Sequence, residues 1–393
     1  MKNGLYLSDV LDLSDLKHDC FNIIVAPCGC GKTHAAIYKL APLASTPRKA
    51  LFLIDTHNGN LRLAKEDGIT LPYAFYEDSI NFHYFCGENF PQDKIVATTY
   101  AQFGVWAGRN PDFASYFDII VCDEVHNLPT YATFSPEPNF VSQARDALCF
   151  AAEHLPSTLI VGITATPKPL KWLNCRKHRV PVETSLLRQY ENLSERSYAS
   201  LPLLMKHIPQ GQRGMLYVKH ISQMIACAEI ASAEGHKPIC VWSTSNPEHP
   251  MTEEQLAARE YILEHEEIPP QYDLFIFNAS SETAINIRGQ VDYIITHTSN
   301  PTNLTQARGR YRDDLKVLYY YDKENGEIIV PEAFLDIRLF AEDKQQLRAV
   351  IGLKDDKGHD YPYKKLFARL EQNGYTLEYG RVENRHYLTI HKK

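Results

Sequence analysis

The sequence has no long apolar segment, no paired cysteine motif and no surplus of positive charge. Its longest apolar runs, such as residues 21–26, 119–122 and 158–163, are far shorter than the roughly 20 residues that span a bilayer. The first ten residues turn acidic at once and lack the basic and apolar regions of a signal peptide. We therefore expect a cytoplasmic protein with no membrane partner.

The nine cysteines are odd in number and scattered, and none of them forms a Cys-x-x-Cys pair, so the sequence indicates neither a disulfide framework nor structural zinc. The 41 Lys and Arg residues are outnumbered by 48 Asp and Glu residues, which gives a net charge of −7. Without a global positive field, any contact with nucleic acid must be local. The chain has 393 residues, 44% of them hydrophobic, which is enough for two or three globular domains of about 150 residues each.

Short apolar and β-branched runs alternate with amphipathic stretches, a pattern that predicts parallel sheets with helical crossovers. The predicted strands are residues 22–26, 50–55, 94–99, 118–122 and 158–164, then 214–219, 238–243, 272–278, 291–297 and 316–322. The predicted helices include residues 140–155, 221–234, 252–266 and 303–311. The polar segment from Val182 to about Ser200 is interpreted as a linker or a solvated helix. The fold class is therefore α/β, with two lobes of similar size and a short C-terminal appendage.

A glycine-rich loop, Ala26-Pro27-Cys28-Gly29-Cys30-Gly31-Lys32-Thr33, follows the first predicted strand and opens a helix. This is the context of a phosphate-binding loop, in which backbone amides and the helix N-terminus face phosphate oxygens. Lys32 would then reach the β and γ phosphates of a nucleotide, and Thr33 would ligate Mg²⁺. Ala26 replaces the usual first glycine, and a chance glycine turn before a helix is the alternative.

Two acids, Asp123 and Glu124, stand at the C-terminal end of another predicted buried strand, in the run Asp118-Ile-Ile-Val-Cys-Asp-Glu-Val-His126. Open α/β sheets bind their ligands at this end of the strands. Asp123 is suited to hold Mg²⁺ through water, and Glu124 to orient and deprotonate an attacking water. Alone, the pair could be a helix N-cap with a first-turn acid. Together with the glycine-rich loop it favours nucleotide hydrolysis.

The loop at 26–33, the box Asp123-Glu-Val-His126 and the run Gly162-Ile-Thr-Ala-Thr-Pro167 resemble motifs I, II and III of superfamily 2 helicases of the DExH type. Further resemblances cover residues 51–56 (motif Ia), 96–103 (a nucleic-acid-contacting motif), 215–221 (motif IV), 280–287 (motif V, with Ala284 in place of glycine) and 306–312 (motif VI). The resemblance implies two tandem RecA-like lobes, which we expect at residues 1–185 and 186–330, with an α+β appendage at 331–393.

Motif VI, Gln306-Ala-Arg-Gly-Arg-Tyr-Arg312, would supply charge from the second lobe. A guanidinium can neutralise the charge that spreads in a phosphoryl-transfer transition state, so Arg310 and Arg312 are the candidate arginine fingers. Asp313 lies where the family pattern usually has its last arginine. The resemblance implies a γ-phosphate contact for Gln306. A solvent-exposed basic helix face is the alternative.

The resemblance also implies residues that couple nucleotide state to lobe closure and residues that contact nucleic acid. The coupling candidates are His126, Thr164 and Thr166, for which a threonine-rich strand end is the alternative. The nucleic-acid candidates are Thr56, Thr98, Thr99, Tyr100, Lys219, Ser243 and Ser280, although a hydroxyl at a strand end often serves as a cap. Such contacts fall mainly on phosphates rather than bases.

The combined reading predicts an ATP- and Mg²⁺-dependent helicase or translocase acting on single-stranded or duplex nucleic acid, with DNA slightly favoured over RNA. A protein partner that stimulates the motor is also possible. The alternatives are a non-unwinding ATP-gated clamp or assembly switch, and a P-loop kinase acting on a small molecule. Residues 14–21 contain no glutamine of the kind that reads adenine in DEAD-type relatives, so nucleotide choice is expected to be relaxed.

Two further segments suggest hypotheses. Cys28 and Cys30 stand beside a lysine and a helix N-terminus, which can lower a thiol pKa, although both could be small loop fillers. Residues 360–393 carry seven Lys and Arg residues against four acidic residues, a net charge of +3. A helical stripe ending at Gly374 and a hairpin about Glu383-Asn384 predict either a small winged-helix-like reader of nucleic acid or a packing module for the second lobe.

Overall fold

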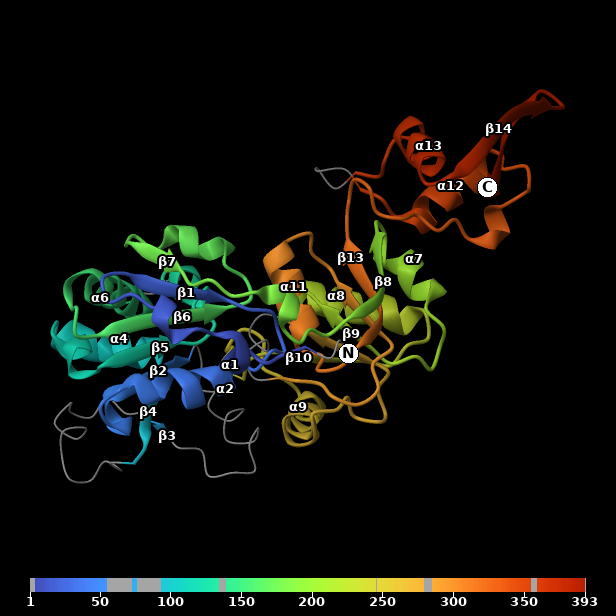
Figure 1. The fold of residues 1–393 in the computed structure, drawn as a ribbon. Helices are drawn as coiled ribbons and strands as arrows, with labels where there is room; N and C mark the ends of the chain where they lie inside the picture. The colour runs from blue at the N-terminus through green and yellow to red at the C-terminus, as the bar shows by residue number, and fades with distance from the viewer. Residues whose placement is uncertain are drawn as a thin grey trace. The chain divides into compact units, whose positions relative to one another are not determined.

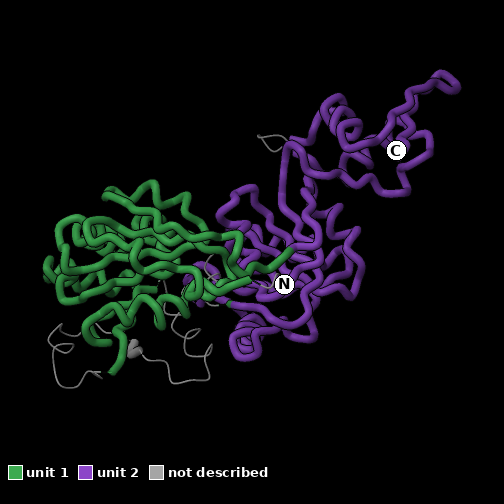
Figure 2. The backbone as a smooth tube through the Cα atoms, in the orientation of Figure 1, with its two compact units in different colours: residues 1–191, 283–285 green, residues 192–282, 286–393 purple. Residues whose placement is uncertain are grey.

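The computed structural model describes residues 4–54, 73–75 (backbone only), 93–133, 139–244, 246–278, 285–354 and 359–392. The chain divides into two compact units, shown in Figure 2: unit 1 comprises Met1–Glu191 and Thr283–Ile285, and unit 2 comprises Asn192–Glu282 and Asn286–Lys393. Within the described ranges, no helix has both the length and the apolar character needed to cross a membrane.

Unit 1 is built on a seven-stranded sheet with the order β3-β4-β2-β5-β6-β1-β7, in which every pair of neighbours is parallel (Figure 1). The strands are β1 (Phe21–Val25), β2 (Ala50–Ile54), β3 (Tyr73–Phe75), β4 (Ile95–Thr99), β5 (Ile119–Cys122), β6 (Leu159–Thr164) and β7 (Lys177–Arg179). Strands β2, β4, β5 and β6 are buried along their whole length. Burial on both faces explains why they are continuous apolar runs.

The helices of unit 1 cover both faces of this sheet. They are α1 (Leu7–Val10), α2 (Lys32–Ala35), the π-helical η2 (Ala36–Leu40), α4 (Tyr100–Arg109), α5 (Asn127–Tyr131) and α6 (Phe140–His154), with 3₁₀ turns η1 (Leu13–Asp15), η3 (Ala41–Leu43), η4 (Pro47–Lys49), η6 (Phe113–Tyr116), η7 (Lys168–Trp172) and η8 (Thr184–Leu186). Helices α4 and α6 pack closely at Gly104, where a Cβ would lie 1.7 Å from the Phe140 carbonyl oxygen. Only glycine permits that approach.

Unit 2 repeats the arrangement with a six-stranded parallel sheet of order β10-β11-β9-β12-β13-β8. Its strands are β8 (Asn192–Tyr198), β9 (Gly214–Tyr217), β10 (Pro238–Val241), β11 (Leu274–Phe277), β12 (Tyr293–Thr296) and β13 (Leu315–Tyr321). Its helices are α7 (Leu201–His207), α8 (Ile221–Ala233), α9 (Glu253–His265) and α11 (Pro301–Gly309). The expected α/β class with two parallel-sheet lobes is confirmed.

The end of unit 2, residues 331–392, forms a smaller α+β part that we call the C-terminal module. It contains η9 (Glu332–Phe334), α12 (Ala341–Ile351), α13 (Tyr363–Gln372) and the antiparallel strands β14 (Tyr375–Val382) and β15 (Arg385–Lys392). Glu383 and Asn384 join the strands with φ of 46° and 68°, which is the left-handed geometry of a tight hairpin turn. The predicted helix and hairpin are therefore confirmed.

All ten predicted strands are present, but the interpretation of the polar segment 182–200 is wrong. It contains η8 and the seven-residue strand β8, which pairs in parallel with β13. β8 stands at the edge of its sheet and most of its residues are not buried. Besides β13 it meets Glu327 through a bridge at Tyr198. A partly solvated edge strand of this kind lacks the apolar run by which buried strands are recognised.

Candidate nucleotide-binding site

The glycine-rich loop leaves the sheet at the C-terminal end of β1 and enters α2. The amide of Ala26 donates to the Thr164 carbonyl at 2.9 Å, which ties the start of the loop to β6. Gly29 and Gly31 have φ of 85° and 79°, a left-handed geometry that costs glycine little and other residues more. The amide of Leu7 donates to the Cys30 carbonyl at 2.8 Å and fixes the loop to α1.

Two tyrosine rings border this loop, and sequence reasoning missed both. A Cβ on Gly29 would lie 2.2 Å from Cε2 of Tyr190, and a Cβ on Gly31 would lie 3.1 Å from Cδ1 of Tyr6. The guanidinium of Arg188 donates to the Tyr6 hydroxyl and stands 5.5 Å from the centre of its ring. These residues meet because Leu5 and Leu187 form a parallel bridge. No local sequence pattern predicts this contact.

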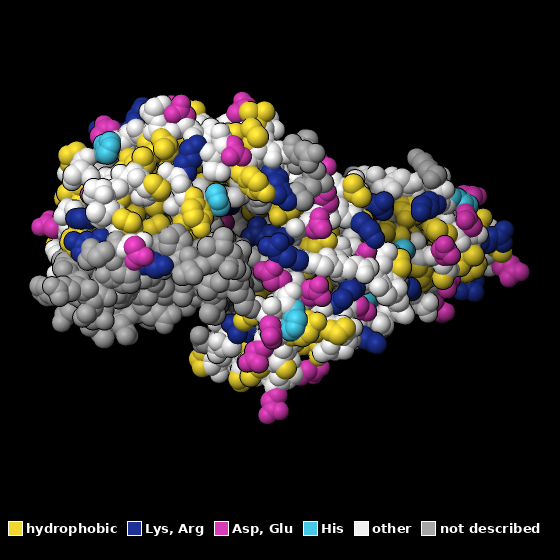
Figure 3. All heavy atoms as spheres, turned by 60° about the horizontal axis from the view of Figure 1, so that its bottom comes forward, with side chains coloured by type: hydrophobic (Ala, Val, Ile, Leu, Met, Phe, Trp, Pro, Cys, Tyr) yellow, Lys and Arg dark blue, Asp and Glu magenta, His cyan; other side chains and the backbone are white. Residues whose placement is uncertain are grey.

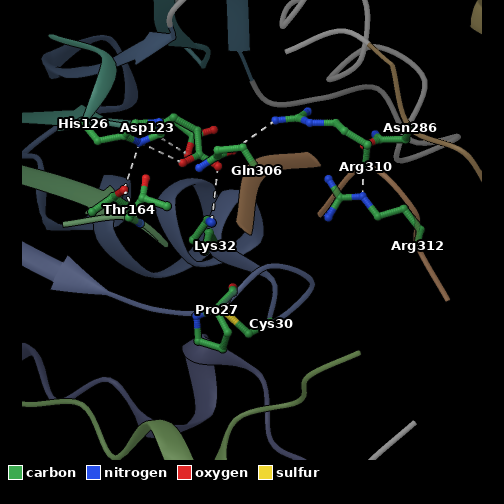
Figure 4. A network of polar contacts seen from close by, with 12 residues as sticks. Pro27, Cys30, Lys32, Asp123, His126, Thr164, Asn286, Gln306, Arg310 and Arg312 are labelled. Carbon is green, nitrogen blue, oxygen red and sulfur yellow. Dashed lines mark hydrogen bonds and ion pairs between the residues drawn. The ribbon is translucent and has the colours of Figure 1, made fainter. Parts of the chain in front are cut away.

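A chain of polar contacts connects the loop to the acidic box and to β6 (Figure 4). Lys32 Nζ lies 3.3 Å from Glu124 Oε1, and the other oxygen of Glu124 lies 3.4 Å from Nδ1 of His126. The same nitrogen of His126 is 3.0 Å from the Thr164 hydroxyl, which accepts a hydrogen bond from the Thr166 amide at 2.9 Å. The structure therefore brings together five residues expected to act in chemistry or coupling.

Lys32 is buried, with 9% of its surface exposed. Burial opposes its charged form, but the charges of Glu124, Cys28 and Asp123 outweigh that effect and raise the pKa of Lys32. The ammonium group therefore stays protonated at neutral pH. It provides a fixed positive charge at the start of α2, where a phosphate group would be bound.

Glu124 has an unusual backbone conformation, with φ of 43°. Its amide donates to Asp123 Oδ1 at 3.0 Å, and its carbonyl accepts from the Asn127 amide at 2.9 Å. The preceding residue is anchored as well, since the Asp123 amide donates to the Leu53 carbonyl at 2.8 Å and the Asp123 carbonyl accepts from the Tyr100 hydroxyl at 2.7 Å. These bonds hold a non-glycine residue in a region that costs about 1–2 kcal/mol, a kind of strain found at functional sites.

Thr33 and Asp123 provide the donor set expected for Mg²⁺ near this loop. Thr33 is half-buried, and Asp123 is buried with one carboxylate oxygen engaged by the Glu124 amide. Mg²⁺ is commonly held by one or two protein oxygens together with waters and substrate phosphates, and a hydroxyl with a carboxylate fits that pattern. The part of the chain that the structure describes contains no cluster of three His, Cys, Asp or Glu residues that could hold a metal by itself.

The motif VI residues lie at the end of α11 in unit 2. Arg310 Nη2 donates to Gln306 Oε1 at 3.4 Å, and Arg312 Nε donates to Asn286 Oδ1 at 3.0 Å (Figure 4). The backbone between them is fixed because the Ile287 amide donates to the Arg310 carbonyl at 2.7 Å and the Arg312 amide to the Ile287 carbonyl at 2.9 Å. Gln306 and Arg310 are both 4% exposed.

Arg308 lies between Gln306 and Arg310 in the sequence, and its side chain holds parts of the fold together. It donates to Asn192 Oδ1 of β8, to the Tyr311 carbonyl at 3.0 Å and to the Asp313 carbonyl at 2.8 Å. These bonds tie α11 to the edge strand and to the turn that follows. Its guanidinium is therefore occupied by backbone and amide groups.

The nucleic-acid candidates lie in different environments. Thr98, Thr99 and Tyr100 are buried, and Thr99 caps α4 by accepting from the Gln102 amide at 3.1 Å. Lys219 is exposed after β9, and Ser243 is partly exposed after β10. Thr56 and Ser280 lie outside the described residues.

The expectation of a lowered thiol pKa is wrong for Cys30. This residue is fully buried, and burial raises its pKa to about 11. Its thiol lies 3.1 Å from the Pro27 carbonyl oxygen inside the loop. Cys28 is only half-buried.

Comparisons with known proteins agree with this fold. Residues 7–169 match the family described as type III restriction enzyme, res subunit. A search of curated proteins gave no match. Among solved structures, a variant of S. cerevisiae Dbp5 bound to RNA and ADP BeF3 is similar with a TM-score of 0.50 and 12% identity, over 90% of this chain and 89% of that chain. Escherichia coli DEAH/RHA helicase HrpB is 14% identical with a TM-score of 0.48, over 92% of this chain and 49% of that chain.

At 12% identity, the similarity to the Dbp5 structure supports the fold alone. The match at 7–169 falls within unit 1, which carries the glycine-rich loop and the acidic box. The chain has the fold of tandem RecA-like helicase lobes, and residues 7–169 in its first unit are similar to the family described as type III restriction enzyme, res subunit.

Proposed function

We propose that this chain is a nucleic-acid-dependent ATPase of the superfamily 2 helicase type, of the DExH kind, which uses ATP hydrolysis to move along or unwind nucleic acid. The observation that carries the proposal is the chain of contacts from Lys32 through Glu124 and His126 to Thr164. It joins a phosphate-binding loop to a carboxylate and then to β6, the strand that ends at Thr164. A small-molecule kinase has no need of the second RecA-like lobe.

The Lys32–Glu124 pair gives the site a way to respond to nucleotide. The phosphates of ATP would compete with Glu124 for the buried ammonium group, because both are anions within its reach. Once displaced, the Glu124 carboxylate could accept a proton from the attacking water. His126, 3.4 Å from the second carboxylate oxygen, would limit the directions in which that carboxylate can turn. Mg²⁺ held by Thr33 and Asp123 would neutralise phosphate charge.

We assign the complementary positive charge to unit 2. Arg310 and Arg312 are the proposed arginine fingers, and Gln306 is the proposed γ-phosphate contact. The hydrogen bond from Arg310 to Gln306 supports this assignment because it holds the two side chains as one group. Arg308 is left out because its hydrogen bonds serve the fold.

We assign coupling to His126, Thr164 and Thr166. A movement of Glu124 changes the environment of His126, whose ring contacts the Thr164 hydroxyl at 3.0 Å. Because Thr164 also accepts from the Thr166 amide, the change would reach the turn after β6. That turn begins the connection to the rest of the chain.

The proposed track is nucleic acid, with DNA slightly favoured over RNA. The similar Dbp5 structure is bound to RNA, which supports nucleic acid as the ligand class. A protein partner that stimulates the activity remains part of the proposal.

Steady-state ATPase assays test this function. Wild type and Glu124→Gln are compared without polymer and then with single-stranded DNA, duplex DNA and single-stranded RNA. The motor is supported if one polymer stimulates hydrolysis and Glu124→Gln abolishes that stimulation. The control Glu229→Gln, on the exposed face of α8, should keep it. Hydrolysis indifferent to every polymer favours the clamp or assembly switch. No hydrolysis by wild type under any condition contradicts the proposal.

A further inference from the structure

The C-terminal module has the chain order of a winged helix. Leu339 forms an antiparallel bridge with Leu388, in which its amide donates at 2.8 Å and its carbonyl accepts at 3.0 Å. The segment at Leu339 is therefore bridged to β15, and it is followed by α12, α13 and the β14–β15 hairpin. Figure 1 shows the hairpin reaching beyond the two helices. In helix-turn-helix proteins of this kind, the second helix enters the major groove of DNA.

Helix α13 packs one face against the sheet and leaves the other free. Leu366 and Leu370 are buried in a core with Leu388 and Ile390 of β15. The exposed positions of the helix are Lys364, Lys365, Ala368, Glu371 and Gln372. These positions recur at the spacing of one helical face. The face has positive charge at its N-terminal half, a small residue at its centre, and side chains that can hydrogen-bond to base edges.

The hairpin adds cations near its tip at Glu383 and Asn384. Arg381, Arg385 and His386 are exposed there, and Arg381 donates to the Asn384 side chain. Arg385 stands over the Phe340 ring at 4.6 Å, and Lys365 of α13 stands over the Tyr361 ring at 4.2 Å. An aromatic ring positions a cation without consuming its charge as a carboxylate would.

These cations are not neutralised by the acids around them. Among the described residues, no carboxylate lies within ion-pair distance of Lys364, Lys365, Arg381 or Arg385, and the ion pairs of the module are Lys354–Asp360, His391–Asp336 and His391–Glu378. Glu371 and Glu383 are the other acids on α13 and the hairpin. On the face drawn in Figure 3, Lys and Arg side chains are spread over the C-terminal module, with acidic side chains between them.

We propose that the C-terminal module docks on duplex DNA, with the exposed face of α13 in the major groove and the cations of the hairpin on the flanking phosphates. The major groove of B-form DNA admits a helix, whereas that of A-form RNA is too deep and narrow. The proposal rests on the proposed function in taking nucleic acid as the partner, but it requires no ATP hydrolysis. It gives a chain of net charge −7 a local surface for a polyanion.

Fluorescence anisotropy of the full chain without ATP tests the proposal. The probes are a DNA duplex of about 20 base pairs, or two helical turns, the matching single strand and RNA duplex, and heparin as a competitor without grooves. The triple variant Lys364→Ala, Lys365→Ala, Arg381→Ala is compared with the control Lys206→Ala, Lys237→Ala, Arg288→Ala, which removes three exposed charges of unit 2 outside the C-terminal module. Thermal melting verifies that both variants fold.

The triple variant should bind duplex DNA at least about tenfold more weakly and reduce the slope of log affinity against log salt by about 2 to 3. The control should stay within about twofold of wild type. Duplex affinity unchanged in the triple variant overturns the proposal. So does equal binding of DNA duplex, RNA duplex and heparin, or a preference for the single strand.

The docking proposal and the proposed function can fail separately in this design. Glu124→Gln should lose ATP hydrolysis and keep duplex binding, and the triple variant should keep ATP hydrolysis measured without polymer. If the wild type shows no ATPase activity but binds duplex DNA, and the triple variant loses that binding, the proposed motor function is refuted and the docking surface is retained.

Discussion

The charged groups of the two units are arranged differently. In unit 1 the buried Lys32 is paired with Glu124, which in turn contacts His126. In unit 2, Arg312 donates to a neutral group, the side-chain oxygen of Asn286, at 3.0 Å. A carboxylate partner can be exchanged for a phosphate at little electrostatic cost, whereas a cation on neutral partners keeps its full attraction for an incoming anion. Under the proposed function, this difference gives unit 1 the response to nucleotide and unit 2 the stabilisation of charge that develops on the phosphates.

The largest expected effect separates the arginines of unit 2. Arg310→Gln should lower kcat about 10³-fold, because an arginine finger contributes at least that much to phosphoryl transfer. Arg308→Gln should instead lower the free energy of unfolding by about 3 kcal/mol, since buried carbonyls lose their donor. ATPase assays and urea unfolding of both variants measure the contrast. If Arg310→Gln and Arg308→Gln lost stability equally and had the same kcat, Arg310 would have no role in the chemistry.

The next effect concerns the carboxylate of unit 1. Glu124→Gln should lower kcat about 10²-fold by removing the general base, while the affinity for ATP stays the same or rises because Lys32 loses a competing anion. Titration with a fluorescent ATP analogue beside steady-state kinetics separates binding from turnover. A variant that turns over ATP at the wild-type rate would leave Glu124 with a structural role only.

A smaller effect tests the backbone strain at Glu124. Glu124→Gly should be more stable than Glu124→Ala by about 1 kcal/mol, because glycine adopts a positive φ without steric cost. At position 226, on the exposed face of helix α8, the opposite is expected. There the wild-type Ala226 should be more stable than Ala226→Gly by about 1 kcal/mol. Urea unfolding gives both differences. Ala and Gly equally stable at position 124 would mean that the strain is relieved elsewhere.

The smallest expected effect is a pH dependence in unit 2. Burial alone would raise the pKa of Asp292, but hydrogen bonds from Lys316 Nζ at 2.6 Å and the Arg213 amide at 3.0 Å lower it. A lowered pKa stabilises the fold above the ordinary value near 4, and this contribution disappears as the pH falls through the folded-state pKa. Asp292→Asn should therefore make the melting temperature fall less steeply as the pH is lowered into the acid range. The corresponding change in the free energy of unfolding should be no more than about 1 kcal/mol. An identical acid limb in wild type and Asp292→Asn would contradict this.

The positions of the candidate site residues were predictable where those residues are contiguous in the sequence. The loop at 26–33 and the acids at 123–124 each follow a buried strand, so local patterns place them at the same edge of the sheet. Tyr6, Arg188 and Tyr190 could not be found in this way, because they reach the loop only through the bridge between Leu5 and Leu187. The burial that raises the pKa of Cys30 likewise depends on tertiary packing.

The fold shows the same division. Buried strands such as β5 and β11 are unbroken apolar runs and are recognised at once. β8 was missed because most of its residues are exposed or half-buried, including the adjacent and exposed Glu195 and Arg196. Its place in the sheet is fixed by its pairing with β13, which a single sequence does not reveal.

The polar composition of β8, which prevented its prediction from the sequence, also affects how the protein behaves at high concentration. An edge strand presents unpaired backbone groups to any other chain, and a long apolar edge invites sheet-to-sheet aggregation. Along β8 the charged side chains of Glu195 and Arg196 stand exposed beside those groups. A second strand pairing there would have to bury or displace both charges, so the polarity of this strand protects the sheet against self-association.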